Sequence, residues 1–145
     1  MKKTIGGLVS VVLLLGGVFC FAHAQTAAPL PPITAAQYVR SAPGDVFIML
    51  VGLDSCRPCR MAEKLVFTPL LHYYAGQEAV HVVKVDVQAA GAAEQETIIK
   101  PFNVTSTPTL LVVQNGQILW RKVGFEQTQK DTTIQEIIRT VGTLY

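Results

Sequence analysis

Residues 46–59 read VFIMLVGLDSCRPC, in which a continuous apolar run leads through a short turn to two cysteines three positions apart. An unbroken apolar run such as 46–51 is typical of a strand that is covered on both faces of a sheet. Residues 52–55 then turn the chain, and we expect a helix to begin around Cys56. The stretch therefore predicts a buried strand that leads into a Cys-x-x-Cys pair at the N-terminus of a helix.

The spacing of Cys56 and Cys59 suits thiol–disulfide exchange, in which one thiol attacks and a second resolves the mixed disulfide. A helix N-terminus carries partial positive charge and free N–H groups, which lower a thiol pKa from about 8.5 to as little as 3.5–7.5. We therefore predict that Cys56 is the nucleophile and that Cys59, one turn inside and less exposed, is the resolving thiol. Arg57 adds a cation that lowers the pKa of Cys56 further, and Pro58 presets helical geometry in the first turn.

The other predicted elements alternate around this unit. They are a helix over 34–41 capped by Thr34, a helix from Cys59 to about Tyr74 with a kink at Pro69, a strand over 79–87, a helix over 94–102, a hairpin with strands 109–113 and 118–123 around Asn115-Gly116, and a helix over 131–141. Strands separated by helices favour parallel pairing, and a terminal hairpin adds an antiparallel edge. We predict an α/β domain with a mixed central sheet, parallel strands plus a terminal antiparallel hairpin, flanked by helices.

The N-terminus has the layout of a secretory signal. Residues 1–3 (Met-Lys-Lys) are positively charged, and residues 5–22 are apolar and carry no charge. Residues 22–24 (Ala-His-Ala) then place small side chains at the two positions that a signal peptidase inspects. We predict a signal peptide over 1–24, cleaved near Ala24/Gln25. An uncleaved membrane anchor is the alternative, but the helix-breaking prolines that follow favour cleavage.

The predicted mature chain consists of a Pro-rich lead-in over 25–33, outside the core, and one domain over 34–145. Loss of Lys2 and Lys3 lowers the number of Lys and Arg from 12 to 10, which equals the number of Asp and Glu. A neutral domain without a basic stripe is not expected to bind nucleic acid. Cys20 also leaves with the signal, and the remaining pair is too close in sequence to staple a large loop. A chemical purpose for the pair is therefore favoured.

A metal site is the main alternative for the cysteine pair. Zinc needs four ligands, and only His72 and His81 are available to complete a Cys₂His₂ set. His81 is expected to be a half-exposed residue in the middle of a strand, and His72 is more than three helical turns from Cys59. We therefore expect no metal and no other cofactor besides the redox-active disulfide. A metal-handling protein and a redox-idle binding module remain the two alternative functions.

Three pieces of sequence resemble the thioredoxin superfamily in content, order and spacing: LVGLDSCRPCRMAEKL, VVKVDV and NVTSTPTLLVVQNGQILWRKVGF. The resemblance covers about residues 34–142. It implies that Cys56 and Cys59 are the redox pair and that Pro108 is a cis-proline facing them. It also implies that Thr107 offers backbone groups to an extended substrate strand and that Gly124 borders the substrate groove. From the residues alone, the Thr107–Pro108 bond could equally be an ordinary trans bond before a strand.

The chain also departs from the thioredoxin pattern. Ser55 and Arg57 replace the tryptophan and glycine that flank the first cysteine in thioredoxin. The buried aspartate of thioredoxin falls on Leu50, so that Lys84, which matches the lysine beside that aspartate, would lack its partner. These departures resemble the trimmed periplasmic thioredoxin-like proteins more than a general cytosolic thioredoxin.

Without a carboxylate at Leu50, Cys59 must lose its proton by another route. Water is one candidate, and Glu63, one turn further along the helix, is the other. For Glu63, the favoured interpretation from the sequence is a solvated surface carboxylate with no part in the reaction.

The sequence thus predicts an exported, periplasmic thiol–disulfide oxidoreductase that acts on protein thiols and disulfides. Arg57 stabilises a thiolate and so favours an oxidant. Periplasmic proteins of the resembled class nevertheless include dedicated reductases that a membrane electron donor keeps reduced. We favour a reductase over an oxidase or isomerase and expect a monomer with a membrane electron donor or acceptor.

Overall fold

The computed structural model describes residues 28–145. The predicted signal peptide, its cleavage site, the alternative membrane anchor and Cys20 all lie outside these residues. Within residues 28–145, none of the helices combines the length and the apolar character needed to cross a membrane.

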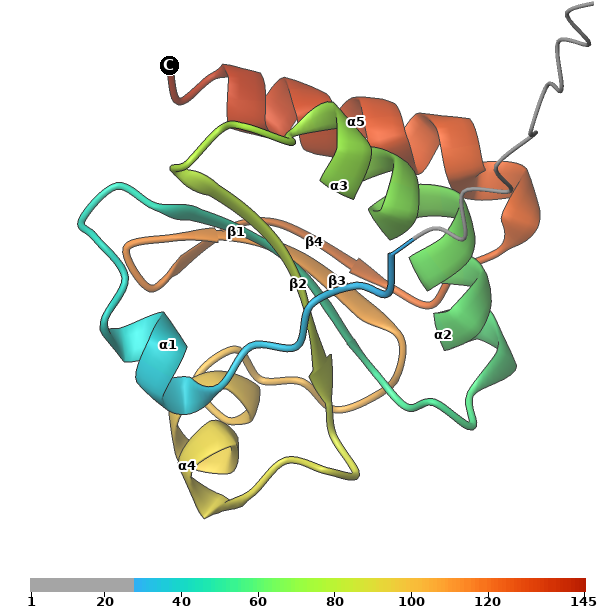
Figure 1. Ribbon diagram of the computed structural model, residues 1–145. Helices are drawn as coiled ribbons and strands as arrows, with labels where there is room; N and C mark the ends of the chain where they lie inside the picture. Colours follow the sequence, from blue (N-terminus) through green and yellow to red (C-terminus); the bar gives the residue numbers. More distant parts are fainter. Residues whose placement is uncertain (1–27) are drawn as a thin grey trace, which may run out of the picture.

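A four-stranded sheet in the order β2-β1-β3-β4 forms the centre of the domain (Figure 1). Its strands are β1 (Val46–Gly52), β2 (Val80–Asp86), β3 (Thr109–Gln114) and β4 (Gln117–Val123). β1 pairs in parallel with β2 and antiparallel with β3, and β3 pairs antiparallel with β4. Every residue of β1 is buried, as its unbroken apolar run predicts for a central strand. The predicted mixed sheet is confirmed, with one parallel pair.

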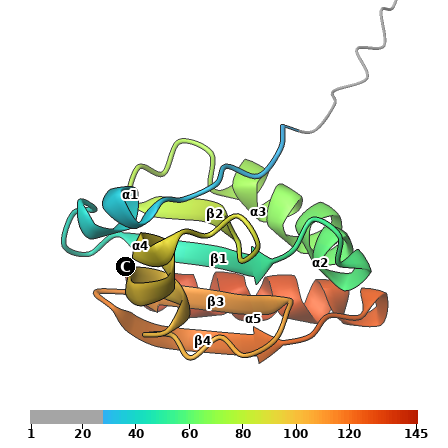
Figure 2. The same cartoon turned by 90° about the horizontal axis from the view of Figure 1, so that it is seen from below.

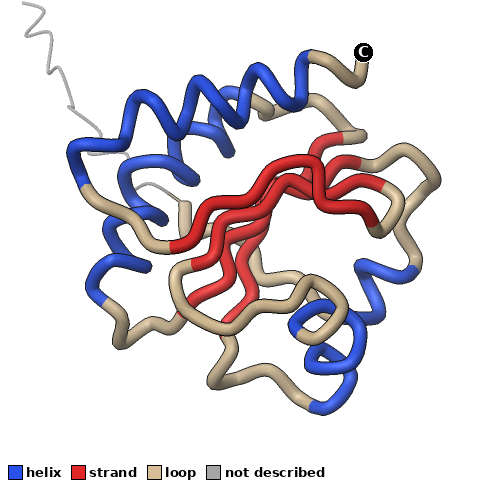
Figure 3. Tube along the Cα trace, turned by 180° about the vertical axis from the view of Figure 1, so that it is seen from behind, coloured by secondary structure: helices blue, strands red, loops and turns tan. Residues whose placement is uncertain are grey.

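Helices cover both faces of the sheet, as Figures 1 and 2 show. One face carries α2 (Arg57–Ala62), α3 (Thr68–Tyr73) and α5 (Lys130–Gly142), and the other carries α1 (Ala35–Val39) and α4 (Ala92–Glu94). A hydrophobic core lies on each face of the sheet, and alternate residues of β1 point into the two cores. Ile48 and Leu50 pack on the α3 and α5 side, and Phe47 and Met49 pack on the α1 side. The tube in Figure 3 shows the sheet between these two layers.

The long helix after the cysteines is broken, although the break lies earlier than predicted. A π-helical segment, η1 (Glu63–Phe67), separates α2 from α3, and the kink expected at Pro69 falls in the turn before it. Pro69 has no N–H, and its ring clashes with the carbonyl four residues earlier. The backbone N–H of Thr68 therefore bonds the carbonyl of Glu63, five residues back. The proline causes the break, but the preceding turn accommodates it.

The Pro-rich lead-in contributes to the core, so its predicted place outside the core is wrong. Leu30 and Ile33 are both buried. The Ile33 N–H bonds the Lys84 carbonyl at 3.0 Å, and the Lys84 N–H bonds the Pro31 carbonyl at 2.9 Å. Prolines are tolerated at a sheet edge, where a missing donor does not interrupt the ladder. The lead-in therefore covers part of the outer edge of β2.

Capping and turn residues mark the start of α1 and the hairpin turn, as predicted from the sequence. Thr34 caps α1 in a capping box with Gln37. Asn115 and Gly116 both have positive φ and form the hairpin turn between β3 and β4. The helix predicted over 94–102 begins and ends earlier. It consists of α4 and the π-helical segment η2 (Gln95–Ile99) that follows it directly, and it stops before Pro101.

Candidate functional site

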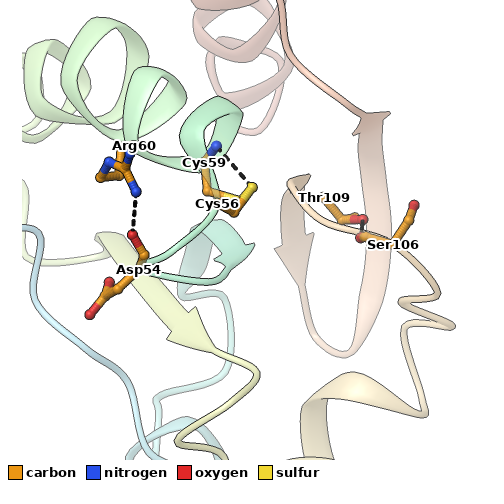
Figure 4. Close-up of a disulfide and its surroundings, with 6 residues drawn as sticks. All are labelled: Asp54, Cys56, Cys59, Arg60, Ser106 and Thr109. Carbon is orange, nitrogen blue, oxygen red and sulfur yellow. Dashed lines mark hydrogen bonds between the residues drawn. A yellow bond between two sulfur atoms is a disulfide. The ribbon is translucent and has the colours of Figure 1, made fainter.

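Cys56 is the N-cap residue of α2. The chain leaves β1 at Gly52, and Cys56 adopts an extended conformation, with φ −80° and ψ 113°, immediately before the helix. The backbone N–H of Cys59 points at the Cys56 sulfur, 3.3 Å away, and the two cysteines form a disulfide with their Cα atoms 5.2 Å apart (Figure 4). A free N–H group of the first helical turn therefore faces the sulfur and would stabilise negative charge on it.

The two cysteines differ in exposure. Cys56 is half-buried, and its neighbours Arg57 and Pro58 are exposed. Only 3% of Cys59 is exposed, because it lies one turn inside against the end of β1. An incoming disulfide or alkylating reagent can therefore reach the Cys56 sulfur but not that of Cys59.

Gly52 makes room for the buried sulfur. A Cβ atom placed on Gly52 would lie 3.0 Å from the Cys59 Sγ and 3.1 Å from its Cβ. The last residue of β1 therefore has no side chain because Cys59 packs directly on its α-carbon. Sequence reasoning missed this residue, although a lone glycine at the end of an apolar strand often marks a close approach.

A charged cluster lies beside Cys59. The Lys84 Nζ is 3.1 Å from the Asp54 Oδ1 and 3.6 Å from the Glu63 Oε2. The Glu63 side chain is 25% exposed and that of Asp54 is 76% exposed, so Glu63 is partly buried and ion-paired, unlike the solvated surface carboxylate favoured from the sequence. Lys84 has no aspartate at position 50 to pair with, since that residue is Leu50, and it pairs with Asp54 and Glu63 instead. Asp54 was not singled out from the sequence, because nothing in its spacing connects it with Lys84.

The cluster affects the ionisation of the lysine. Burial alone would lower the pKa of Lys84, but the hydrogen bond that its ammonium donates to Asp54 and the charges of Glu63 and Asp54 raise the pKa above its usual value. Lys84 therefore stays an ammonium at neutral pH.

A cavity of about 10 Å³ lies between the cluster and Cys59. It is lined by Leu50, Cys59, Glu63 and Lys84, among others. This volume is at the lower limit of what one water molecule needs. The arrangement therefore places a carboxylate and space for one water next to the buried thiol.

The loop before β3 faces the disulfide. The Thr107–Pro108 peptide bond is cis, Pro108 is buried and Thr107 is half-buried. The Thr109 hydroxyl donates to the Ser106 carbonyl at 2.7 Å, and Figure 4 shows both residues across from the cysteines.

Gly124 lies against this loop. Its N–H bonds the Pro108 carbonyl at 2.8 Å, and its φ of 78° is one that glycine adopts without strain. The structure therefore brings Thr107, Pro108 and Gly124 together.

The two histidines within residues 28–145 lie away from the cysteines. The His81 Nε2 is 3.2 Å from the Asp45 Oδ2, and its ring stacks on Phe47, near the opposite end of β1 from the disulfide. His72 is exposed on α3. Among residues 28–145, no group of three or more His, Cys, Asp or Glu side chains is placed to hold a metal ion.

Comparison with known proteins agrees with this geometry. Residues 37–140 match the family model for thioredoxin. The chain belongs to the thioredoxin family. Thioredoxin H2 of Arabidopsis thaliana is 31% identical to this thioredoxin-family chain over 83 residues, which cover 57% of the chain and 55% of the relative. The chain thus spans about half the length of this curated relative.

Solved structures show the same fold. Thioredoxin NaTrxh from Nicotiana alata is 25% identical with a TM-score of 0.51, and the match covers 67% of this chain and 74% of that one. The Malassezia sympodialis thioredoxin Mala s 13 is 24% identical with a TM-score of 0.57, over 79% of this chain and 97% of that one. The thioredoxin-like fold predicted from the sequence is confirmed.

Proposed function

We propose that this chain is an exported thiol–disulfide oxidoreductase that exchanges disulfides with protein substrates through Cys56 and Cys59. The observation that carries the proposal is the position of the disulfide. The accessible Cys56 caps α2 and is bonded to the buried Cys59, opposite the loop that contains Thr107 and Pro108. Membership of the thioredoxin family supports the same chemistry.

The proposed reaction starts from the reduced pair. The Cys56 thiolate attacks one sulfur of a substrate disulfide, forms a mixed disulfide and releases the other substrate sulfur as a thiolate. Cys59 then loses its proton, and its thiolate attacks the Cys56 sulfur. This step forms the Cys56–Cys59 disulfide and releases the second substrate thiolate. Two electrons pass from the protein to the substrate, and an external protein dithiol restores the reduced pair.

Substrate binding is proposed for the loop across from the cysteines. Thr107 would offer its backbone groups to an extended segment of the substrate, as one more strand would pair with a sheet edge. Pro108 would hold that segment opposite Cys56, and Gly124 would leave its path open because it has no side chain. Arg57 and Pro58 would tune Cys56 by charge and by local helix geometry.

Glu63 is proposed as the group that accepts the proton of Cys59. Its carboxylate and the buried thiol line the same small cavity, which has space for one bridging water. Lys84 would be a positioning residue, since its ammonium lies 3.6 Å from the Glu63 Oε2 and would hold the carboxylate beside the cavity. The proton would pass from the Cys59 Sγ through water to the Glu63 carboxylate and then to solvent.

For the cellular role we propose a periplasmic, monomeric reductase that a membrane electron donor keeps reduced. The signal-like residues 1–24 support export, with residues 34–145 as the working domain behind the lead-in. The direction follows the resemblance to periplasmic reductases. The reduction potential of the pair tests it, because a value near −270 mV indicates a reductant and one near −120 mV an oxidant.

The activity itself is tested with a neutral peptide disulfide and the reduced, purified protein. We expect release of peptide thiol with stoichiometric formation of the Cys56–Cys59 disulfide. Release no faster than with a free monothiol of the same concentration would contradict the proposal and favour a redox-idle binding module. Retention of stoichiometric Zn(II) or Cu(I) by the pair would instead favour a metal-handling protein.

A further inference from the structure

Three exposed cations lie on the helical face that begins at Cys56. Arg57, Arg60 and Lys64 are separated by three and four residues, so they lie on neighbouring turns of α2 and η1. Together with Met61 and Leu65 they line a groove of about 320 Å³. The groove therefore combines a cationic rim with an apolar floor, directly beside the nucleophile.

The charges of this rim are not neutralised within the protein. No carboxylate of the described residues forms an ion pair with any of the three cations. Glu63, the acid on the same segment, is paired with Lys84 instead. The predicted mature chain has as many acidic as basic residues, so the excess is local. A concentration of positive charge beside a reactive thiol is expected to attract anionic groups of a partner.

Arg60 is held in place rather than free in solution. Its Nη1 donates to the backbone carbonyl of Asp54 at 2.7 Å, as Figure 4 shows. Guanidinium has five N–H donors, so this bond leaves others for a carboxylate. A cation that is already ordered loses less entropy when it binds a partner.

We propose that this groove is a specificity surface for the acidic flank of a protein partner whose cysteine reacts with Cys56. The inference rests on the proposed function and adds a substrate class to it. Carboxylates of the partner would pair with Arg60 and Lys64, and an apolar side chain between them would contact Met61 and Leu65. The apolar floor favours a peptide segment over a free inorganic anion.

The length of the groove limits how far the acidic residues of the partner can lie from its reactive cysteine. Lys64 follows Arg57 by seven positions, which corresponds to a rise of about 10 Å along the helix. An extended peptide covers this distance in about three residues. The acidic side chains of a preferred partner should therefore lie within about four residues of its reactive cysteine.

The test uses three synthetic peptides that share one sequence around a single cysteine, which is held in a disulfide with 2-mercaptoethanol. The residues flanking the cysteine are acidic, neutral or basic. The second-order rate constant for reduction of each peptide is measured with the reduced, purified protein at low and high salt. We expect the acidic peptide to react roughly tenfold faster than the basic one at low salt, and this ratio to fall at high salt.

Variants assign the effect to the groove. Lys64→Gln should lower the acidic-to-basic ratio, and Lys64→Glu should lower it further. Arg40→Glu is the matched control, because Arg40 is exposed at the end of α1, on the other face of the sheet, and should leave the ratio unchanged. Lys64 is exposed, so neither change should unfold the domain.

Each contrary outcome has a distinct meaning. A wild-type ratio near one, with the neutral peptide still reduced, overturns the groove proposal and leaves the proposed function intact. Failure to reduce even the neutral peptide overturns the proposed function instead. If Arg40→Glu lowered the acidic-to-basic rate ratio as much as Lys64→Glu does, the effect would come from net charge, and the assignment to this groove would be overturned. Lys64-dependent binding to anionic lipid vesicles without peptide preference would also overturn it.

Discussion

The redox site has two halves that contain the same functional group in different surroundings. Around Cys56 the protein presents a helix N-terminus, exposed cations and partial exposure to solvent. Around Cys59 it presents the bare α-carbon of Gly52 and a cavity that also touches Glu63 and Lys84. In the proposed function these different surroundings give the two thiols different roles. Cys56 would attack or be attacked from outside, and Cys59 would react only with its neighbour and would need an internal route for its proton.

The largest expected effect comes from removing one sulfur at a time. Cys56→Ser should abolish disulfide exchange, because the buried Cys59 cannot reach a substrate. Cys59→Ser should instead accumulate mixed disulfides through Cys56, because nothing resolves them. Non-reducing electrophoresis and peptide mapping of the trapped adducts check both outcomes. If Cys59→Ser trapped no peptide disulfide, or if Cys56→Ser trapped one through Cys59, the proposed roles of the two thiols would be contradicted.

Glu63→Gln tests the surroundings of Cys59 alone. We expect resolution of the mixed disulfide to slow by roughly ten- to a hundredfold near neutral pH, because the proton acceptor of Cys59 is removed. Attack by Cys56 should keep its rate, and higher pH should restore the resolution step. Single-turnover kinetics with a peptide disulfide separate the two steps.

Glu96→Gln is the control for this change, since Glu96 is also ion-paired with a lysine but lies on η2, away from the cysteines. A similar slowing in Glu96→Gln, or equal slowing of both steps in Glu63→Gln, would remove Glu63 from the proposed proton route.

Gly52→Ala tests how closely Cys59 packs against the end of β1. The added Cβ would press on the Cys59 sulfur at 3.0 Å, and overpacking of this kind costs about 1–3 kcal/mol of the free energy of unfolding. Gly142→Ala is the matched control, because it lies in α5 with nothing within 4 Å of the new Cβ and should gain up to about 1 kcal/mol. Urea unfolding of the oxidised proteins measures both values. The same sign for both variants would contradict the close contact at Gly52.

Lys84→Gln should have the smallest effect, about 1 kcal/mol or less. Because the folded protein raises the pKa of Lys84, the bound proton stabilises the fold at every pH below the lysine's unfolded value. This contribution is lost as the pH rises through the raised value. Wild type should therefore be more stable than the variant at neutral pH, and the two should converge in strongly alkaline solution. Urea unfolding across this range checks the sign, and a difference that grows with pH would contradict it.

Features with a local cause were predictable from the sequence. The apolar run ending at Gly52 predicted the central strand, Thr34 predicted a cap, and Asn115-Gly116 predicted the hairpin turn, because each depends on neighbouring residues alone. The position of Cys56 at the start of a helix follows from the same stretch. The kink caused by Pro69 was predictable, whereas the turn that accommodates it was not.

Features assembled from distant segments were not predictable. Lys84 comes from β2, Asp54 from the loop after β1 and Glu63 from η1, so their ion pairs exist only in the folded sheet. The lead-in was predicted to be outside the core because prolines dominate it. Its burial depends on the edge of β2, which accepts Leu30 and the neighbouring backbone.

The asymmetry of the two thiols is tested most directly by timed alkylation of the reduced protein, with each cysteine quantified by peptide mapping across a range of pH. We expect Cys56 to be labelled already at pH 6 and at least about tenfold faster than Cys59, because only the Cys56 sulfur is both accessible and stabilised as a thiolate. Equal rates at the two positions, faster labelling of Cys59, or an inert Cys56 at pH 6 would contradict it.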